Sequence, residues 1–333
     1  MQLHRKCFKD DGVTISMPQY SVQYVDDVAW DKFQQSSPQR SAFSSSAFLS
    51  ALPVERRFLF VNVGSEVVGG IPLLVKSESL TIPPFSVLAG IHFSDMSKSK
   101  PTKRIETQFR VGEAIAEHVF EVFPNGSFSN CPSVVDFRPF DWFNHGQLES
   151  KGGFTTTLRY TSRVRIEGKS CSSKFSQLRR RDLKLAARSG VVFDCCENVD
   201  ALDSLHRLTF ERQGLVRPDV ETKALKSICL TATETGFGKQ FSSQIDGKIV
   251  SSTLWIMDDR IAYYLFGANH PEYRNTGAAT LCMWQSMLSI LRERGIQIFD
   301  FVGVNSPQRG AFKLGFGGEV VPYVNVNRIQ PCQ

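Results

Sequence analysis

The stretch Tyr273-Arg274-Asn275-Thr276-Gly277-Ala278-Ala279 decides how the rest of the sequence is interpreted. It follows an aromatic and β-branched run at 260–267, typical of a strand, and precedes a helix-period segment at 278–294 that Gly295 ends. At the first turn of a helix, backbone N–H groups lack partners and the helix dipole is positive. Small residues leave these donors accessible, so the turn is predicted to hold a pyrophosphate. An ordinary strand-to-helix turn is the alternative.

The composition is that of a soluble globular protein. The chain has 333 residues, 41% of them hydrophobic and 22% charged, which is enough for two domains with real cores. No apolar stretch approaches the ~20 residues that span a bilayer, so we expect no membrane insertion. Residues 1–10 lack the apolar segment of a secretory signal, and the eight scattered cysteines form no metal-binding pair. We therefore expect a reduced, cytoplasmic protein without a metal.

The net charge is mildly basic, at +6 with a pI of about 8.9. This balance suits an anionic ligand, for example a coenzyme, a nucleotide-linked acceptor or tRNA, and it selects none of them. We expect no DNA partner. The sequence does not define the oligomeric state.

The second half of the sequence has a regular order of elements. They are predicted as a strand at 191–196, helices at 200–212 and 220–235, strands at 241–245, 249–256 and 260–267, a helix at 278–294, a strand at 296–302, a short helix at 306–314 and a strand at 319–326. Asp246-Gly247 between two of the strands is typical of a tight hairpin. Gly236 is predicted to end the second helix.

The first half repeats this order less clearly. Its hairpin at 58–75 resembles the one at 245–256, and a helix is predicted at 105–123. Where the second half has Arg274-x-x-Gly277-x-Ala279, the first has only Arg110-Val111-Gly112, so the phosphate loop is absent there. We predict an internal duplication. The predicted units are an N-terminal degenerate domain at 1–168, a basic inter-domain helix at 169–190, and a C-terminal domain at 191–333.

With these stretches in view, the chain resembles the FemAB-type, tandem-domain members of the GNAT superfamily. The matching stretches are 36–38 with 48–52, 161–166 with 178–190, 299–303, and Ala311-Phe-Lys-Leu-Gly-Phe-Gly-Gly-Glu319, the most specific. The resemblance implies an α+β (α/β) fold of two tandem GNAT-like (acyl-CoA N-acyltransferase) domains, each a mixed, mainly antiparallel sheet flanked by helices. The chain departs from the family pattern at Asp182-Leu183, and it has no room for the coiled-coil insertion often found in members that use aminoacyl-tRNA.

The resemblance also implies a donor and a reaction centre. Arg274, Asn275, Thr276, Gly277, Ala278 and Ala279 resemble the superfamily's coenzyme A loop, so acetyl-CoA or another acyl-CoA is the implied donor. In this superfamily an amine attacks the thioester where two parallel strands part, here 260–267 and 296–302. Lys313, with Phe312 beside it, is implied to lie at that site and to help hold charge there. A solvated lysine in a glycine-rich turn is the alternative.

Two strand residues are further catalytic candidates. Asp300 points away from its neighbours Phe299 and Phe301. Apolar surroundings raise the pKa of a carboxyl group, which would suit Asp300 as a general base; a buried carboxylate paired to an arginine is the alternative. Tyr264 is a candidate proton donor to the departing thiolate, with a core aromatic as the alternative.

Substrate contacts are predicted in two places. The helix at 177–188 carries a dense set of cations: Arg179, Arg180, Arg181, Lys184 and Arg188. Arg179 is a candidate phosphate contact for a nucleotide-linked acceptor or tRNA, and a solvated helix face is the alternative. Arg138 and Trp142 are candidate acceptor contacts in a pocket between the domains, where simple interface packing is the alternative.

The resulting prediction is an enzyme, an N-acyltransferase that moves an acetyl-type group from acyl-CoA to a primary amine. The expected acceptor is a small molecule such as an amino sugar or amino acid, in cell-envelope polysaccharide synthesis. A FemAB-type aminoacyltransferase that uses aminoacyl-tRNA on a peptidoglycan precursor is the first alternative. A non-catalytic GNAT-fold binding protein is the second, since fold alone does not establish chemistry.

Overall fold

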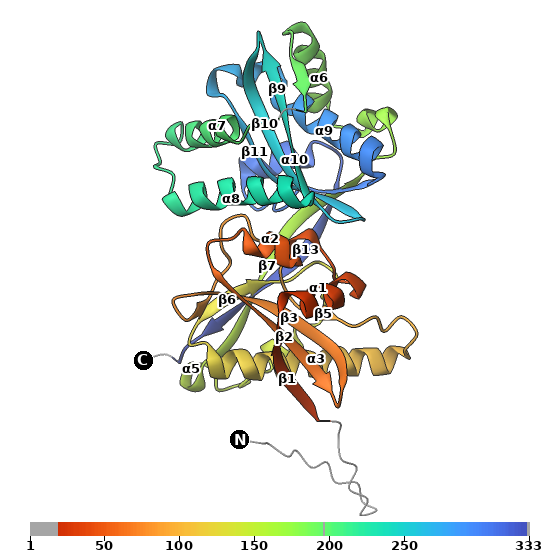
Figure 1. Cartoon of the computed structure of the whole chain (residues 1–333), viewed down its shortest axis with the longest axis vertical. Coiled ribbons are helices and arrows are strands. Elements are labelled where there is room, and N and C mark those ends of the chain that lie inside the picture. The colour runs from red at the N-terminus through yellow and green to blue at the C-terminus, as the bar shows by residue number, and fades with distance from the viewer. Residues whose placement is uncertain (1–18, 196, 332–333) are drawn as a thin grey trace, which may run out of the picture.

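The computed structural model describes residues 19–331 apart from residue 196, so residues 1–10, where no secretory signal is expected, lie outside it. Its strands form one 13-stranded mixed sheet that runs through both halves of the molecule (Figure 1). The strand order is β1-β2-β3-β4-β6-β13-β7-β12-β11-β10-β9-β8, and β5 pairs with β3. The predicted fold class, a mixed and mainly antiparallel sheet flanked by helices, is confirmed.

The strands lie at β1 (Tyr20–Val25), β2 (Glu55–Val63), β3 (Glu66–Lys76), β4 (Ser79–Leu80), β5 (His92–Phe93), β6 (Gly126–Ser129), β7 (Gly153–Arg165), β8 (Val192–Asp194), β9 (Gly238–Ile245), β10 (Lys248–Met257), β11 (Ile261–Asn269), β12 (Ile298–Asp300) and β13 (Glu319–Ile329). The α-helices are α1 (Asp27–Ser36), α2 (Ser46–Ser50), α3 (Pro101–Val122), α4 (Arg138–Asp141), α5 (Leu148–Lys151), α6 (Gln177–Arg188), α7 (Val199–Glu211), α8 (Asp219–Thr235), α9 (Ala278–Arg294) and α10 (Pro307–Leu314). Short 3-10 helices lie at η1 (Ala42–Ser44), η2 (Lys169–Lys174) and η3 (Pro271–Thr276).

The two ends of the sheet have the same plan. In the first half β1, β2, β3 and β4 pair antiparallel in sequence order, and β6 then joins β4 in parallel. In the second half β8, β9, β10 and β11 pair antiparallel in sequence order, and β12 then joins β11 in parallel. This shared plan is what the predicted duplication requires.

Two long strands in the middle tie the halves together. β7 pairs along its length with β13, and its last residues also pair with β12. β13, the last strand of the chain, pairs in turn with β6 of the first half. The sheet therefore does not break at the predicted boundaries of 168 and 191, which stay a prediction.

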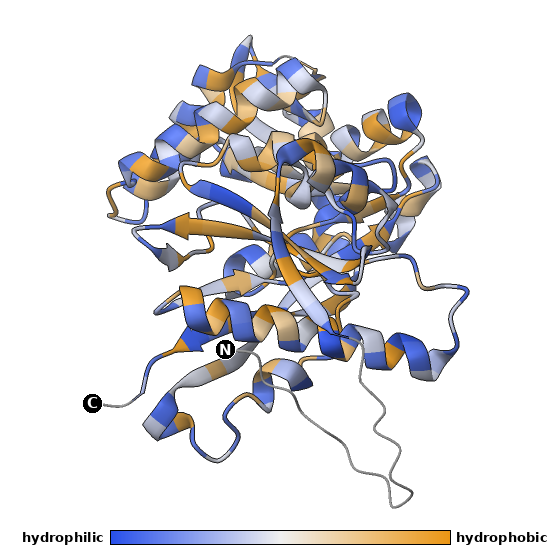
Figure 2. Ribbon diagram, turned by 60° about the horizontal axis from the view of Figure 1, so that its bottom comes forward, coloured by the Kyte–Doolittle hydropathy of each residue, from blue (hydrophilic) through white to orange (hydrophobic). Residues whose placement is uncertain are grey.

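The second half is a sheet between two helical layers. Leu254 and Ile256 of β10 share a core with residues of α7 and α8, whereas Trp255 and Met257 share another with α9. Alternate strand residues point to opposite faces, so α7 and α8 cover one face and α9 covers the other. Hydrophobic and hydrophilic residues alternate around the outer helices (Figure 2), as expected for helices with one buried side.

Local turn signals in the second half are confirmed. Asp246 and Gly247 both have positive φ, 50° and 75°, as a tight hairpin turn requires. α8 and α9 end at Gly236 and Gly295, both in the left-handed conformation. Within the described residues, no helix has the length and apolar character that crossing a membrane requires.

Candidate active site

The parallel strands β11 and β12 part within the second half. They pair at three positions, from Ile261↔Ile298 to Tyr263↔Asp300. β11 continues to Asn269 while β12 ends at Asp300, so the segment of β11 from residue 264 onward has no partner from β12. An opening between strands 260–267 and 296–302 was predicted, and the register agrees with it. Such an opening exposes backbone polar groups of one strand edge to a ligand.

Lys313 of α10 lies at this opening. Its Nζ donates hydrogen bonds to the carbonyl oxygens of Val302 at 2.7 Å and Gly303 at 2.9 Å, directly after β12. Both residues have positive φ, 46° and 73°, an unusual conformation for valine. The same Nζ lies 5.4 Å from the centre of the Tyr264 ring on β11. The ammonium group therefore stands between the two parted strands.

Burial changes the proton affinity of both side chains. Burial, aided by Arg309 and opposed by Asp300, lowers the pKa of Lys313 to about 8. Burial, with a contribution from Cys282, raises the pKa of Tyr264 well above its ordinary value. Tyr264 thus keeps its proton near neutral pH, as a proton donor must. A Cβ at Gly267 would lie 1.8 Å from the Tyr264 hydroxyl oxygen, so Gly267 provides the space for that hydroxyl.

Asp300 does not have the surroundings of a general base. Its side chain is fully buried and pairs with Arg163 Nε at 2.8 Å. It also accepts hydrogen bonds from the Thr161 hydroxyl and from the Val302 backbone N–H at 2.9 Å. The geometry contradicts the base prediction, because the carboxylate is saturated with donors and has no exposed surface. Asp300 instead fixes the end of β12 and the turn whose carbonyl groups bind Lys313.

The predicted pyrophosphate turn is partly covered by α6. Gly277 begins α9 with a φ of 78°, and a Cβ there would lie 2.1 Å from the Asp182 carbonyl oxygen. Gly277 and Ala278 are buried and Ala279 is half-buried, whereas Arg274 and Asn275 are exposed. The Thr276 hydroxyl donates to the Tyr273 carbonyl oxygen and accepts from the Ala278 N–H. The exposed residues of the turn therefore lie on its η3 side, and α6 covers the other side.

Arg179 is an internal contact in the structure. Its Nη1 lies 3.0 Å from the Thr280 hydroxyl and 3.1 Å from Asp182 Oδ2, and its guanidinium stacks over Phe312 at 4.6 Å. The side chain joins α6, α9 and α10, which contradicts the prediction that it contacts a substrate phosphate. The ring of Phe312 is thus occupied by the Arg179 guanidinium. The other four cations of α6, at 180, 181, 184 and 188, are exposed.

Arg138 and Trp142 lie elsewhere in the molecule. They line a surface hollow of about 350 Å³ together with residues of α3. Arg138 stacks on Phe109 and Trp142 and pairs with Asp136. All these residues belong to the first half, and α3 lies at the far end of the molecule from α10 (Figure 1). The prediction of a pocket between the domains is therefore wrong, since the hollow is made by α3 and α4 alone.

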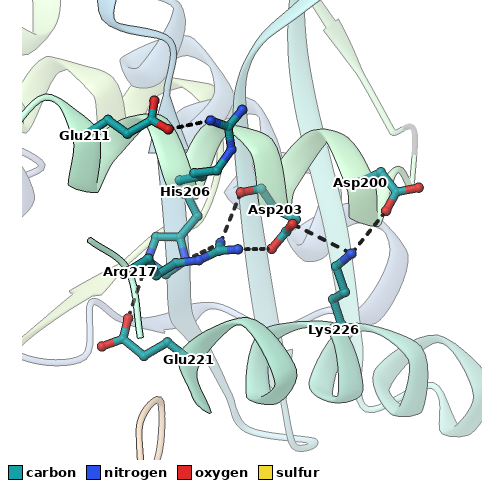
Figure 3. A network of polar contacts seen from close by, with 8 residues as sticks. Asp200, Asp203, His206, Glu211, Arg217, Glu221 and Lys226 are labelled. Carbon is teal, nitrogen blue, oxygen red and sulfur yellow. Dashed lines mark hydrogen bonds and ion pairs between the residues drawn. The ribbon is translucent and has the colours of Figure 1, made fainter. Parts of the chain in front are cut away.

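The sequence interpretation missed a polar cluster where α7 meets α8 (Figure 3). Arg217, in the connection, pairs with Asp203 at 2.7 Å and donates to His206 Nδ1 at 3.3 Å. His206 Nε2 faces Glu221 Oε2 at 3.8 Å. Burial and nearby cations lower the pKa of His206 to about 4, so the ring is neutral. The spacing of Asp203 and His206 by three residues on a predicted helix was the available signal, because it puts both on one face.

The cluster is electrostatically linked to the opening at Lys313. Arg309 of α10 is exposed, and its charge acts on His206 and Glu221 as well as on Tyr264 and Lys313. The ring of Phe266, two residues beyond Tyr264 on β11, lies 4.3 Å from the His206 ring. The two groups of side chains thus border the same free segment of β11.

Comparisons with known proteins agree with this geometry. Residues 172–313 match the family model described as an acetyltransferase (GNAT) domain, a range that contains α6, β11, α9 and Lys313. A search of curated proteins found no match.

Solved structures extend the likeness to the whole chain. The crystal structure of FemX has a TM-score of 0.63 and 15% identity, covering 91% of this chain and 96% of that one. A conserved protein of unknown function from Bacteroides thetaiotaomicron has a TM-score of 0.60 and 11% identity, covering 94% and 100%. A tandem GNAT protein from the clavulanic acid biosynthesis pathway has a TM-score of 0.51 and 11% identity, covering 94% and 98%. Residues 172–313 therefore match a GNAT acetyltransferase domain, and the chain over most of its length has a fold similar to that of FemX and of a tandem GNAT protein.

Proposed function

We propose that the protein is an N-acyltransferase that forms an amide between an acyl group and the primary amine of a small molecule. One observation carries the proposal: the Lys313 ammonium stands at the opening where β11 and β12 part. A buried cation beside a free strand edge can stabilise the oxyanion that develops when an amine attacks a carbonyl. Orienting the two reactants there supplies much of the remaining rate enhancement.

The three residues of the catalytic prediction each have a place in this reaction. Lys313 and a backbone N–H of the free β11 segment hold the developing oxyanion. Tyr264, whose pKa is raised by burial, gives its proton to the leaving group. Asp300 holds the turn at Val302 and so positions Lys313.

We propose an acyl-CoA, of the acetyl type, as the donor. The GNAT domain match and the order of strand, Arg-x-x-Gly-x-Ala turn and helix support this donor. Since α6 covers one side of Gly277, the diphosphate would bind on the open η3 side, near Arg274 and Asn275. The expected acceptor is an amino sugar or an amino acid, and we propose a role in cytoplasmic steps of cell-envelope polysaccharide synthesis.

Acetyl-CoA binding tests the donor. A ligand that binds only the folded state stabilises it by mass action, by about 2.7 kcal/mol at 100 times its Kd. We expect acetyl-CoA to raise Tm and expect the rise to shrink in Arg274→Ala. We substitute Arg274 and not Gly277, because a Cβ at Gly277 would lie 2.1 Å from the Asp182 carbonyl oxygen. A Gly277 variant that lost acetyl-CoA binding could have lost its fold instead. An unchanged Tm at millimolar acetyl-CoA would contradict this donor, and binding without thiol release in the presence of amines would indicate a non-catalytic binding protein.

A second candidate donor is aminoacyl-tRNA. The exposed cations of α6, Arg180, Arg181, Lys184 and Arg188, favour it, as does the position of α6 over the helix end at Gly277. Contacts to phosphates make binding steeply dependent on salt. If tRNA is the donor carrier, its affinity should fall by at least tenfold between 50 and 200 mM salt (an order-of-magnitude expectation). Replacing these four residues with glutamine should flatten that dependence, while acetyl-CoA leaves Tm unchanged.

A further inference from the structure

The α7–α8 corner packs against the free segment of β11. His206 of α7 is buried, and its ring meets that of Phe266 at 4.3 Å and that of Phe210 at 5.1 Å. Glu221, in the first turn of α8, is half-buried beside it. His206 is thus placed against the free segment of β11, with Glu221 beside it as the other member of a polar pair.

A loop of the first half completes this corner. Phe85 lies 5.8 Å from the Phe266 ring and 6.0 Å from the His206 ring. Both Phe85 and Leu88 have positive φ, 65° and 61°. Such conformations cost energy in bulky residues and tend to occur at functional sites. The strained loop holds an aromatic ring of one half against the polar pair of the other.

The tautomer of His206 follows from its neighbours. Arg217 has only donors, so His206 Nδ1 accepts and the ring proton lies on Nε2. That proton faces Glu221 Oε2 across 3.8 Å, longer than a hydrogen bond. The neutral imidazole therefore faces the carboxylate without neutralising it. The charged groups around Glu221 are Arg217 from the connection, which is already paired to Asp203, and Arg309 from α10, and the neutral titratable group that faces it is His206 from α7.

We propose that Glu221 is the general base that takes the proton of the acceptor amine, with His206 as its positioning residue. This inference rests on the proposed N-acyltransferase function. The acceptor would occupy the corner bordered by α7, α8, the Phe85 loop and the free segment of β11. Burial raises the pKa of Glu221 against the opposing effect of Arg217 and Arg309, which suits a carboxylate that must accept a proton from an amine.

With a thioester donor, an acceptor that arrives as an ammonium first gives one proton to Glu221, which passes it to solvent. The free amine nitrogen then forms a bond to the thioester carbonyl carbon, and the carbonyl π electron pair moves to the oxygen beside Lys313. The proton released by the nitrogen passes to Glu221. Collapse of the intermediate breaks the C–S bond, and the sulfur takes the proton of Tyr264. Proton return from Glu221 to the tyrosinate through solvent restores the enzyme.

The test compares Glu221→Gln with Glu234→Gln, an exposed residue at the other end of the same helix. Thiol release from acetyl-CoA is measured from pH 6 to 10 with glucosamine, L-alanine and L-lysine as probe amines. General base removal typically costs about 10²- to 10⁴-fold in turnover, so we expect a loss of that size in Glu221→Gln near pH 7. The loss should shrink as the pH approaches the pKa of the amine, which then arrives already deprotonated. Glu234→Gln should match the wild type.

A structural role for Glu221 would give a different pattern. The raised pKa means that the folded protein binds this proton more tightly than the unfolded chain, so stability is lost as the pH rises through that range. We therefore expect Glu221→Gln to have a Tm at pH 8 no lower than that of the wild type, with an unchanged Tm rise on acetyl-CoA. A lowered Tm, or full turnover at pH 7, would overturn the role of Glu221 alone. A wild type that binds acetyl-CoA and releases no thiol with any probe amine would overturn the proposed function, and the base with it.

Discussion

The two halves share a sheet plan but differ at the point where a parallel strand joins the antiparallel ones. In the first half the join is a single position, Leu80↔Gly126, between β4 and β6. In the second half it is three positions long and then opens. β4 has two residues, whereas β11 has nine and continues past its partner. The opening in the second half therefore lies where β11, the longer of the two parallel strands, continues past the end of β12.

The space and the side chains next to the two joins differ as well. In the first half a Cβ at Gly126 would lie 2.1 Å from the Leu80 carbonyl oxygen, and the space nearby measures only about 10 Å³. That is about the room of one water molecule. In the second half the Lys313 ammonium group, held by two carbonyl oxygens, borders the opening. One plan thus gives a packed core in the first half and a charged opening in the second.

Removing the buried charge of Asp300, next to the opening between β11 and β12, should have the largest effect, and we expect it on stability. The Asp300 side chain is fully buried, and Asp300→Asn leaves Arg163 without its carboxylate partner. Breaking a buried ion pair from one side costs about 3 to 5 kcal/mol. We expect a loss of that size in the free energy of unfolding, measured with urea, while Asp259→Asn, which is largely exposed, should change it little. A stable Asp300→Asn variant would show that this pair does not hold the opening.

The first join should matter to stability alone. Leu80 is almost fully buried, and truncating a buried leucine to alanine costs about 2 to 5 kcal/mol. We expect Leu80→Ala to lose stability in that range and to keep the turnover and donor KM of the wild type at a temperature where it is folded. A specific loss of turnover in Leu80→Ala would mean that the first half also takes part in catalysis.

Unlike the first join, the opening between β11 and β12 should matter to turnover. Loss of one oxyanion donor typically lowers kcat about 10²- to 10³-fold, and we expect this of Lys313→Met, with Lys174→Met as the exposed control. Because the folded pKa of Lys313 is lowered to about 8, the unfolded chain holds this proton more tightly. The wild type should therefore gain stability relative to Lys313→Met as the pH rises from about 8 to about 10. Equal turnover of wild type and Lys313→Met would remove Lys313 from the mechanism.

The sequence was sufficient for features that depend on neighbouring residues. Asp246-Gly247 marks the hairpin, Gly295 ends α9, and the 3.6-residue period of 278–294 gives that helix its bounds. Each of these features is determined by residues close to one another in the sequence. The most specific motif stretch, which contains Lys313, indicated the opening.

Features that depend on distant residues could not be predicted from pattern. The pairing of β13 with β6 joins residues about 200 apart, such as Ser127 and Asn327. α6 packs against Gly277 and buries Arg179. The many cations of α6 predict an exposed helix, so its sequence shows no sign of this packing. The pairing of Asp300 with Arg163 likewise requires β7 to lie beside β12. A buried carboxylate has the same sequence context whether it is paired or free.

A structure determined with acetyl-CoA bound would show whether acyl transfer takes place at the opening of β11 and β12. We predict density for the thioester beside residues 264–267, with its carbonyl oxygen facing Lys313 and its diphosphate near Arg274. Density for the thioester at the β4–β6 join or in the hollow between α3 and α4, with the opening at Lys313 unchanged, would contradict the account.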